Sequence, residues 1–121
     1  MKLLTKPIRE QLFKNGRITA DLLTAADSDG STKDFKPVVK FFTPFSNCTW
    51  LLTELDPDED RAFGLCDLGM QCPELGYVLI SELESIRGPA GLGVERDLYF
   101  KAVKPLSEYA DEARIHQAIR A

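Results

Sequence analysis

The sequence predicts an α+β fold: a roughly five-stranded, mostly antiparallel sheet with helices at both ends of the chain and one short helix between strands four and five. Apolar residues change from helical spacing near the start to alternation from residue 37 onward. The strand-like runs 49–55 and 62–68 are separated by too few residues for the crossover helix that a parallel pair requires. The length of 121 residues predicts a single domain over residues 1–121.

The first elements are expected to be two short helices. The apolar stripe of residues 6–15 stops at Asn15-Gly16, a typical helix end. Residues 17–26 can form the second helix. The almost wholly polar stretch 27–36 is then expected to be a flexible loop.

Strands with period-two patterns are expected next, followed by a local switch from strand to helix. The expected strands are residues 38–42, 49–55, 62–68 and 76–80. The run Ser-Glu-Leu-Glu at 81–84 matches a capping box that starts a short helix ending near Arg87. After the glycine-rich loop 88–93 we expect a fifth strand, with Leu98, Phe100 and Ala102 on one face.

The last helix is expected to be capped by Ser107 and to reach the end of the chain. Its final turn is poorly amphipathic, because Ile115 and Ile119 point away from the other apolar residues. Residues 114–121 are therefore expected either to fray or to meet a second surface, and a homodimer is one such surface.

Composition and charge narrow the class of protein. Hydrophobic residues make up 44% of the chain and charged residues 28%, which is ordinary for a soluble globular protein. The net charge of −4 argues against direct binding of nucleic acid, which depends on Lys and Arg, and it suits a basic protein partner. No export signal or membrane span is recognised, and an odd number of cysteines without paired spacing fits reduced thiols, so a cytoplasmic location is expected.

Acidic and aromatic residues, with one arginine, make up the candidate binding surface. The candidates are Trp50, Glu54, Asp56, Asp58, Glu59, Asp60, Asp67, Glu74, Tyr77 and Arg96. The acidic group can hold a divalent cation, or it can form a solvated hairpin tip whose aspartates make turn hydrogen bonds. The spacing lacks the Gly and the final Glu of an EF-hand loop, which favours the hairpin tip. The aromatic candidates are expected in the core or half-buried, unless several are exposed together as a partner-binding patch.

No cofactor and no catalytic residues are expected. No pair among the three cysteines and His116 has the gap of roughly two to four residues that is typical of zinc ligands. The loop 88–93 lacks the Lys-Ser/Thr ending of a phosphate loop and precedes a strand. Cys66 is expected to be buried and the least reactive thiol, whereas Cys72, in a loop, is expected to be exposed.

Several segments resemble one family of proteins, the domain of unknown function numbered 2958. The resembling segments are residues 49–57 (TWLLTELDP), 63–69 (FGLCDLG), 73–78 (PELGYV) and 94–100 (VERDLYF), with the opening Leu-Leu-Thr-Lys, Asn15-Gly16 and the Lys-Pro-Leu-Ser at 104–107. The resemblance implies an accessory protein carried by plasmids, integrative conjugative elements or phage-like regions, in a setting of DNA transfer, replication or host defence. It implies no established activity and no catalytic residue set.

Two functions are compatible with these observations. The first is a non-enzymatic accessory protein of a mobile genetic element that binds another protein through the sheet face or the acidic hairpin, for example as a defence inhibitor. The second is a small metal-assisted hydrolase that uses Glu54, Asp56 and Asp67. The sequence favours the first, because it contains no evident nucleophile or acid–base arrangement.

Overall fold

A computed structural model of the chain describes residues 3–58 and 60–121. The helices are α1 (Lys6–Thr24), α2 (Ile80–Ser85) and α3 (Leu106–His116), with a 3₁₀ turn η1 (Pro89–Gly91), and the strands are β1 (Val39–Phe42), β2 (Thr49–Leu55), β3 (Arg61–Asp67), β4 (Glu74–Leu79) and β5 (Glu95–Arg96). The candidate residue Glu59 lies outside the described residues.

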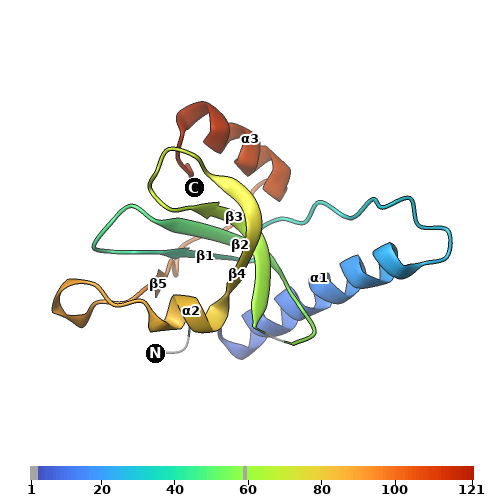
Figure 1. Cartoon of the computed structure of the whole chain (residues 1–121), viewed down its shortest axis with the longest axis horizontal. Helices are drawn as coiled ribbons and strands as arrows, with labels where there is room; N and C mark the ends of the chain where they lie inside the picture. The colour runs from blue at the N-terminus through green and yellow to red at the C-terminus, as the bar shows by residue number, and fades with distance from the viewer. Residues whose placement is uncertain (1–2, 59) are drawn as a thin grey trace.

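The strands form one antiparallel sheet in the order β4-β3-β2-β1-β5. In Figure 1, α3 lies on one side of the sheet, and α1 and α2 lie on the other. The predicted α+β class, with terminal helices and a short helix after the fourth strand, is confirmed. No helix within the described ranges is long and apolar enough to cross a membrane.

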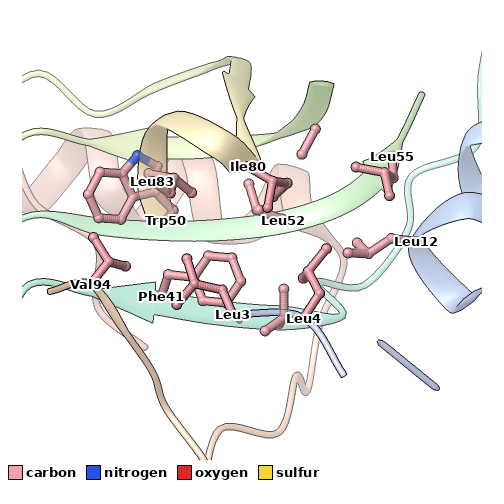
Figure 2. Packing of buried hydrophobic residues seen from close by; sticks show 12 residues of the cluster. Leu3, Leu4, Leu12, Phe41, Trp50, Leu52, Leu55, Ile80, Leu83 and Val94 are labelled. Atoms are coloured by element: carbon pink, nitrogen blue, oxygen red, sulfur yellow. The ribbon is translucent and has the colours of Figure 1, made fainter. Parts of the chain in front are cut away.

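The two faces of the sheet carry separate hydrophobic cores. Alternation along β2 sends Trp50 and Leu52 to one face and Leu51 to the other. The first core gathers side chains from α1, α2 and the start of the chain around the central strands, including Leu3, Leu4, Leu12, Phe41, Trp50, Leu52, Ile80, Leu83 and Val94 (Figure 2). On the second face, α3 packs Leu106, Tyr109, Ala110 and Ala113 against Leu51 and Leu65.

A single helix, α1, runs through the position where a helix stop is predicted. Asn15 and Gly16 are buried against β2. Asn15 Nδ2 donates a hydrogen bond to the Thr53 carbonyl at 2.9 Å. A Cβ added to Gly16 would lie 3.0 Å from the Leu55 carbonyl carbon and would overlap its oxygen. The predicted stop is wrong because this pair allows α1 to approach β2 closely.

Aspartates from distant loops cap α2 and α3. Ser81 donates from its amide to Asp60 Oδ1 and from its hydroxyl to Asp60 Oδ2, both at 2.8 Å. In α3, the Ser107 amide donates to Asp34 Oδ1 at 3.1 Å, and the Ser107 hydroxyl also bonds to Asp34. Glu84, which would close the predicted capping box, instead accepts a bond from the Leu3 amide at 3.0 Å. The predicted caps are therefore wrong, since carboxylates reach these helix ends and are strong acceptors there.

The fifth strand is shorter than predicted. β5 pairs with β1 through Phe41↔Arg96 and Phe42↔Glu95, and the Asp97 amide adds a hydrogen bond to the Lys40 carbonyl at 3.0 Å. Asp97 ends it, because Asp97 Oδ1 accepts a hydrogen bond from the Tyr99 amide at 2.9 Å and forms a turn. Beyond this turn Phe100 and Ala102 pack against the second core, but Leu98 is 72% exposed, so the predicted shared face is wrong.

Candidate functional site

The predicted surface residues do not come together in one cavity of the described residues. Arg96, Asp67 and Tyr77 line three different cavities. Trp50 is 3% exposed and belongs to the first core. Glu74 is exposed at the start of β4. The two aromatic candidates therefore differ: Tyr77 is 59% exposed, whereas Trp50 is buried in the first core.

The aspartates of the acidic hairpin between β2 and β3 form hydrogen bonds with other groups of the same chain. Asp56 Oδ2 accepts a hydrogen bond from Arg61 Nε at 2.6 Å. Asp58 Oδ1 accepts bonds from the amides of Asp60, at 3.1 Å, and Arg61, at 3.3 Å. The bond from the Asp60 amide is the main reason why the pKa of Asp58 is lowered. Because Asp60 also caps α2, all three aspartates have structural partners, which supports the interpretation as a hairpin tip.

The three carboxylates of the hydrolase alternative have separate surroundings. Asp56 pairs with Arg61, and Asp67 accepts bonds from the backbone amides of Gly69 and Ile119. Glu54 follows an irregularity in β2 and is half-buried. Within residues 3–58 and 60–121, no group of three or more His, Cys, Asp or Glu side chains is placed to hold a metal ion. The described residues therefore offer this alternative no set of three metal ligands.

Glu54 has a carboxyl group with a raised pKa. Burial is the main cause, because it removes the charged form from water. The neighbouring Thr19 hydroxyl opposes the rise, and the negative charge of Asp56 adds to it. Thr19 Oγ1 makes no hydrogen bond of standard geometry within the described residues. Its lowering influence on the pKa of Glu54 is therefore weaker than the raising influence of burial. Ionised Glu54 is thus a cost to the fold at neutral pH.

Replacing Glu54 with glutamine should stabilise the protein at pH 7. A carboxyl whose pKa is higher in the folded state favours folding below the unfolded value of 4.5, and this contribution is lost as the pH rises through the folded pKa. Because Glu54 is only partly buried, solvent screening limits the expected gain to less than about 1 kcal/mol. Urea denaturation at pH 7 and at pH 4 measures the gain, which should vanish at the lower pH.

The matched control for this prediction is Glu10→Gln, which changes an exposed glutamate on α1. It should alter the unfolding free energy by no more than about 0.5 kcal/mol. A Glu54→Gln variant that is less stable than the wild type at pH 7 would mean that the carboxylate makes a favourable structural contact.

An open groove of about 540 Å³ lies between α2, the glycine-rich loop and β5, and we call it the α2–β5 groove. Its apolar lining residues are Leu3, Leu83, Leu92, Val94 and Leu98, and its charged ones are Glu84, Arg87, Glu95 and Arg96. The sequence had singled out the glycines of residues 88–93 and Arg96, but it gave no sign that exposed leucines border them. Only the fold brings these segments together.

The polar groups of the α2–β5 groove already hold the chain together. Glu84 Oε2 accepts the Leu3 amide, and the Arg96 guanidinium donates to the Leu3 carbonyl. Arg87 Nη1 donates to the carbonyls of Glu84 and Ile86, each at 2.7 Å. These bonds fasten the start of the chain to α2 and β5. Among the apolar lining residues, Leu92 and Leu98 are exposed, whereas Leu3, Leu83 and Val94 are buried.

A second, polar pocket of about 230 Å³ lies where the chain leaves α3. Its lining residues are Asn47, Asp67, Gly69, Gln71, His116, Gln117 and Ala118. Asp67 is 3% exposed and accepts the Gly69 amide at 2.9 Å and the Ile119 amide at 3.0 Å. His116 is exposed at the helix end. The role of Asp67 is thus structural: its carboxylate anchors the C-terminal residues to β3.

All three cysteines are free thiols. Burial raises the pKa of the Cys66 thiol to about 11, so its reactive thiolate form is rare at neutral pH. Cys72 is exposed. Cys72 is thus exposed as predicted, whereas Cys66 is half-buried rather than buried.

Comparison with known proteins identifies the family of the chain. No curated protein and no solved structure matches the chain significantly. A family described as protein of unknown function, DUF2958, matches residues 3–120. This match spans all the helices and strands described above. The chain therefore belongs to the DUF2958 family.

Proposed function

We propose that the protein is a non-enzymatic accessory protein that acts by binding another protein. The observation that carries the proposal is the α2–β5 groove, whose rim exposes Leu92 by 45% and Leu98 by 72%. Full burial of a leucine side chain contributes roughly 1.5–3 kcal/mol. A partner that covers these two leucines therefore gains affinity without any change in the fold.

The groove suits an apolar side chain of a partner better than a small polar molecule. Recognition of a small molecule depends on a few polar groups that converge on it. Here the side chains of Glu84, Arg87 and Arg96 are already hydrogen-bonded to backbone groups of other residues in the chain. The groove can therefore bind a partner mainly through its exposed apolar side chains. Exposed apolar patches of this kind are typical of protein interfaces.

The charge of the protein favours a basic partner. The net charge of −4 attracts positively charged proteins at long range and speeds their encounter. Within the groove, two acidic side chains are balanced by two arginines. Long-range attraction then guides the encounter, and the apolar contact supplies the affinity.

The proposed setting is a mobile genetic element, which rests on the family resemblance of the sequence. The partner is then a protein of nucleic-acid processing or host defence, and inhibition of a defence complex is one form of this function. The proposed interaction takes place in the cytoplasm and does not involve direct binding of nucleic acid.

A photo-crosslinking residue at position 98 tests the proposal in the host. The same residue at position 115 is the matched control, because Ile115 on α3 is 79% exposed and is not among the residues that line the groove. We expect a specific crosslinked protein from position 98 and none from position 115. The same crosslinks from both positions, or none from position 98, would contradict the proposal.

The isolated partner then allows a quantitative test with Leu98→Asp and Ile115→Asp. Both side chains are exposed, so both variants should keep the wild-type unfolding midpoint. Leu98→Asp should weaken binding at least about 10-fold, and Ile115→Asp less than about 2-fold. Isothermal titration calorimetry measures both values.

A further inference from the structure

The polar pocket where the chain leaves α3 is formed by three segments that are far apart in the sequence. Its lining comes from the β1–β2 turn, the β3–β4 loop and the residues that end α3. Asp67 joins two of these segments, because its carboxylate accepts the amides of Gly69 and Ile119. The third segment is in close contact, since a Cβ added to Gly69 would lie 2.6 Å from Asn47 Cγ. The walls of the pocket are therefore held in place before any ligand binds.

The electrostatic environment of this pocket is negative. Among the described residues no lysine or arginine lines it, and Asp67 is its one charged side chain when histidine is neutral at pH 7. The C-terminus of α3 adds the negative end of a helix dipole. The amides of Gln117 and Ala118 both donate to the Ala113 carbonyl. Within the described chain, the carbonyls of residues 114–116 are thus left without a backbone donor. The pocket favours a ligand with positive charge and several hydrogen-bond donors.

Two glutamines of the pocket have a left-handed backbone, which glycine adopts at lower cost. φ is 65° at Gln71 and 59° at Gln117. Strained residues of this kind cluster at ligand sites, where the side chain is needed despite the cost. The side-chain amides of both glutamines, and that of Asn47, form no hydrogen bond within the described part of the chain. Three carboxamides are therefore available to a ligand in one pocket.

We propose that this pocket binds a guanidinium group, the end of an arginine side chain of the partner protein. The carboxamide oxygens and the last carbonyls of α3 accept its hydrogen bonds, and the charge of Asp67 attracts it. Arginine fits better than lysine, because its planar group has five donors and is more weakly hydrated than an ammonium group. This inference rests on the proposed function, since it names a residue of the basic partner.

The polar pocket and the α2–β5 groove lie at the same end of the sheet, where the β1–β2 hairpin and η1 are also found (Figure 1). The β1–β2 turn is in contact with both. A Cβ added to Gly88, in the glycine-rich loop, would lie 2.6 Å from the Phe45 ring, and Asn47 lies against Gly69. One partner can therefore cover the exposed leucines of the groove and place an arginine in the pocket.

A titration with N-acetylarginine amide tests the pocket without the partner. NMR at constant ionic strength follows the side-chain amide signals of Asn47, Gln71 and Gln117, which should shift together. For so small a ligand we expect a dissociation constant on the order of 1 mM. Two matched probes are N-acetylcitrulline amide, in which an uncharged urea group replaces the guanidinium, and N-acetyllysine amide. Each should bind at least about 5-fold more weakly than the arginine probe.

Glycine substitutions separate binding from stability. Gln71→Gly and Gln117→Gly remove the carboxamide and relieve the backbone strain, so each should keep or raise the unfolding midpoint. Each should nevertheless weaken binding of the arginine probe at least about 5-fold. Ala90→Gly is the matched control, because Ala90 also has a positive φ, of 59°, but does not line the pocket. It should act on the midpoint in the same way and leave binding unchanged.

The groove variant Leu98→Asp should bind the arginine probe like the wild type, so a failure of the α2–β5 groove as a binding site would leave this result unchanged. The absence of shifts at the three amides up to about 20 mM arginine probe would overturn the pocket as a binding site. Equal binding of the citrulline or the lysine probe would overturn the choice of a guanidinium. Wild-type binding by both glutamine variants would overturn the role of the carboxamides.

Discussion

Replacing Gly16 with alanine is expected to lower the free energy of unfolding by about 2–3 kcal/mol, although alanine is the better helix former by roughly 1 kcal/mol. The added methyl group would overlap the Leu55 carbonyl oxygen, which belongs to the backbone of β2 and cannot turn away. α1 must then move off the sheet. This shift strains the Asn15–Thr53 hydrogen bond and the packing of Leu12 in the first core.

Urea denaturation followed by the fluorescence of Trp50 measures this effect, because Trp50 is the only tryptophan and is buried. Gly76→Ala is the matched control. Its added Cβ meets nothing within 4 Å, so it should change the unfolding free energy by no more than about 0.5 kcal/mol. If Gly16→Ala proves as stable as the control, the close approach of α1 to β2 is not required by the fold.

Replacing Asp67 with asparagine is expected to lower the free energy of unfolding by about 1.5–3 kcal/mol and to release the residues after α3. Both oxygens of this buried carboxylate accept backbone hydrogen bonds, from the amides of Gly69 and Ile119. Asparagine has the same size, but only its oxygen can accept. One of the two amides would then face an NH₂ group and lose its partner.

Amide hydrogen exchange separates the local from the global part of this effect. The Ile119 amide should exchange faster in Asp67→Asn than the loss of global stability explains. Asp111→Asn is the control, because Asp111 on α3 forms an exposed ion pair with Arg114. That change should cost less than about 1 kcal/mol and leave exchange at Ile119 unaltered. Protection of Ile119 in Asp67→Asn as strong as in the wild type would exclude the anchoring role of Asp67.

For the candidate site, the sequence identified charged residues but not their partners. Asp60 was expected on a binding surface, yet its carboxylate caps α2, whose Ser81 lies 21 positions away. Asp67 was a possible metal ligand, yet it binds the Ile119 amide 52 positions away. Leu98 was expected on one face of a strand together with Phe100 and Ala102, and Leu92 was expected in the loop 88–93. The turn at Asp97 instead leaves Leu98 outside.

The sequence by itself determined the fold class, the antiparallel pairing of β2 with β3 and the family. These follow from local signals, since alternation defines a strand and a short connection requires antiparallel pairing. Only the tertiary structure decided that α1 continues through Asn15-Gly16, which aspartates cap the helices and which apolar residues remain exposed. Each of these depends on atoms far away in the chain. For example, the Thr53 carbonyl that accepts the hydrogen bond of Asn15 is 38 positions distant. Short-range patterns reflect the local preferences of the backbone, whereas packing and capping depend on groups that only the fold brings near.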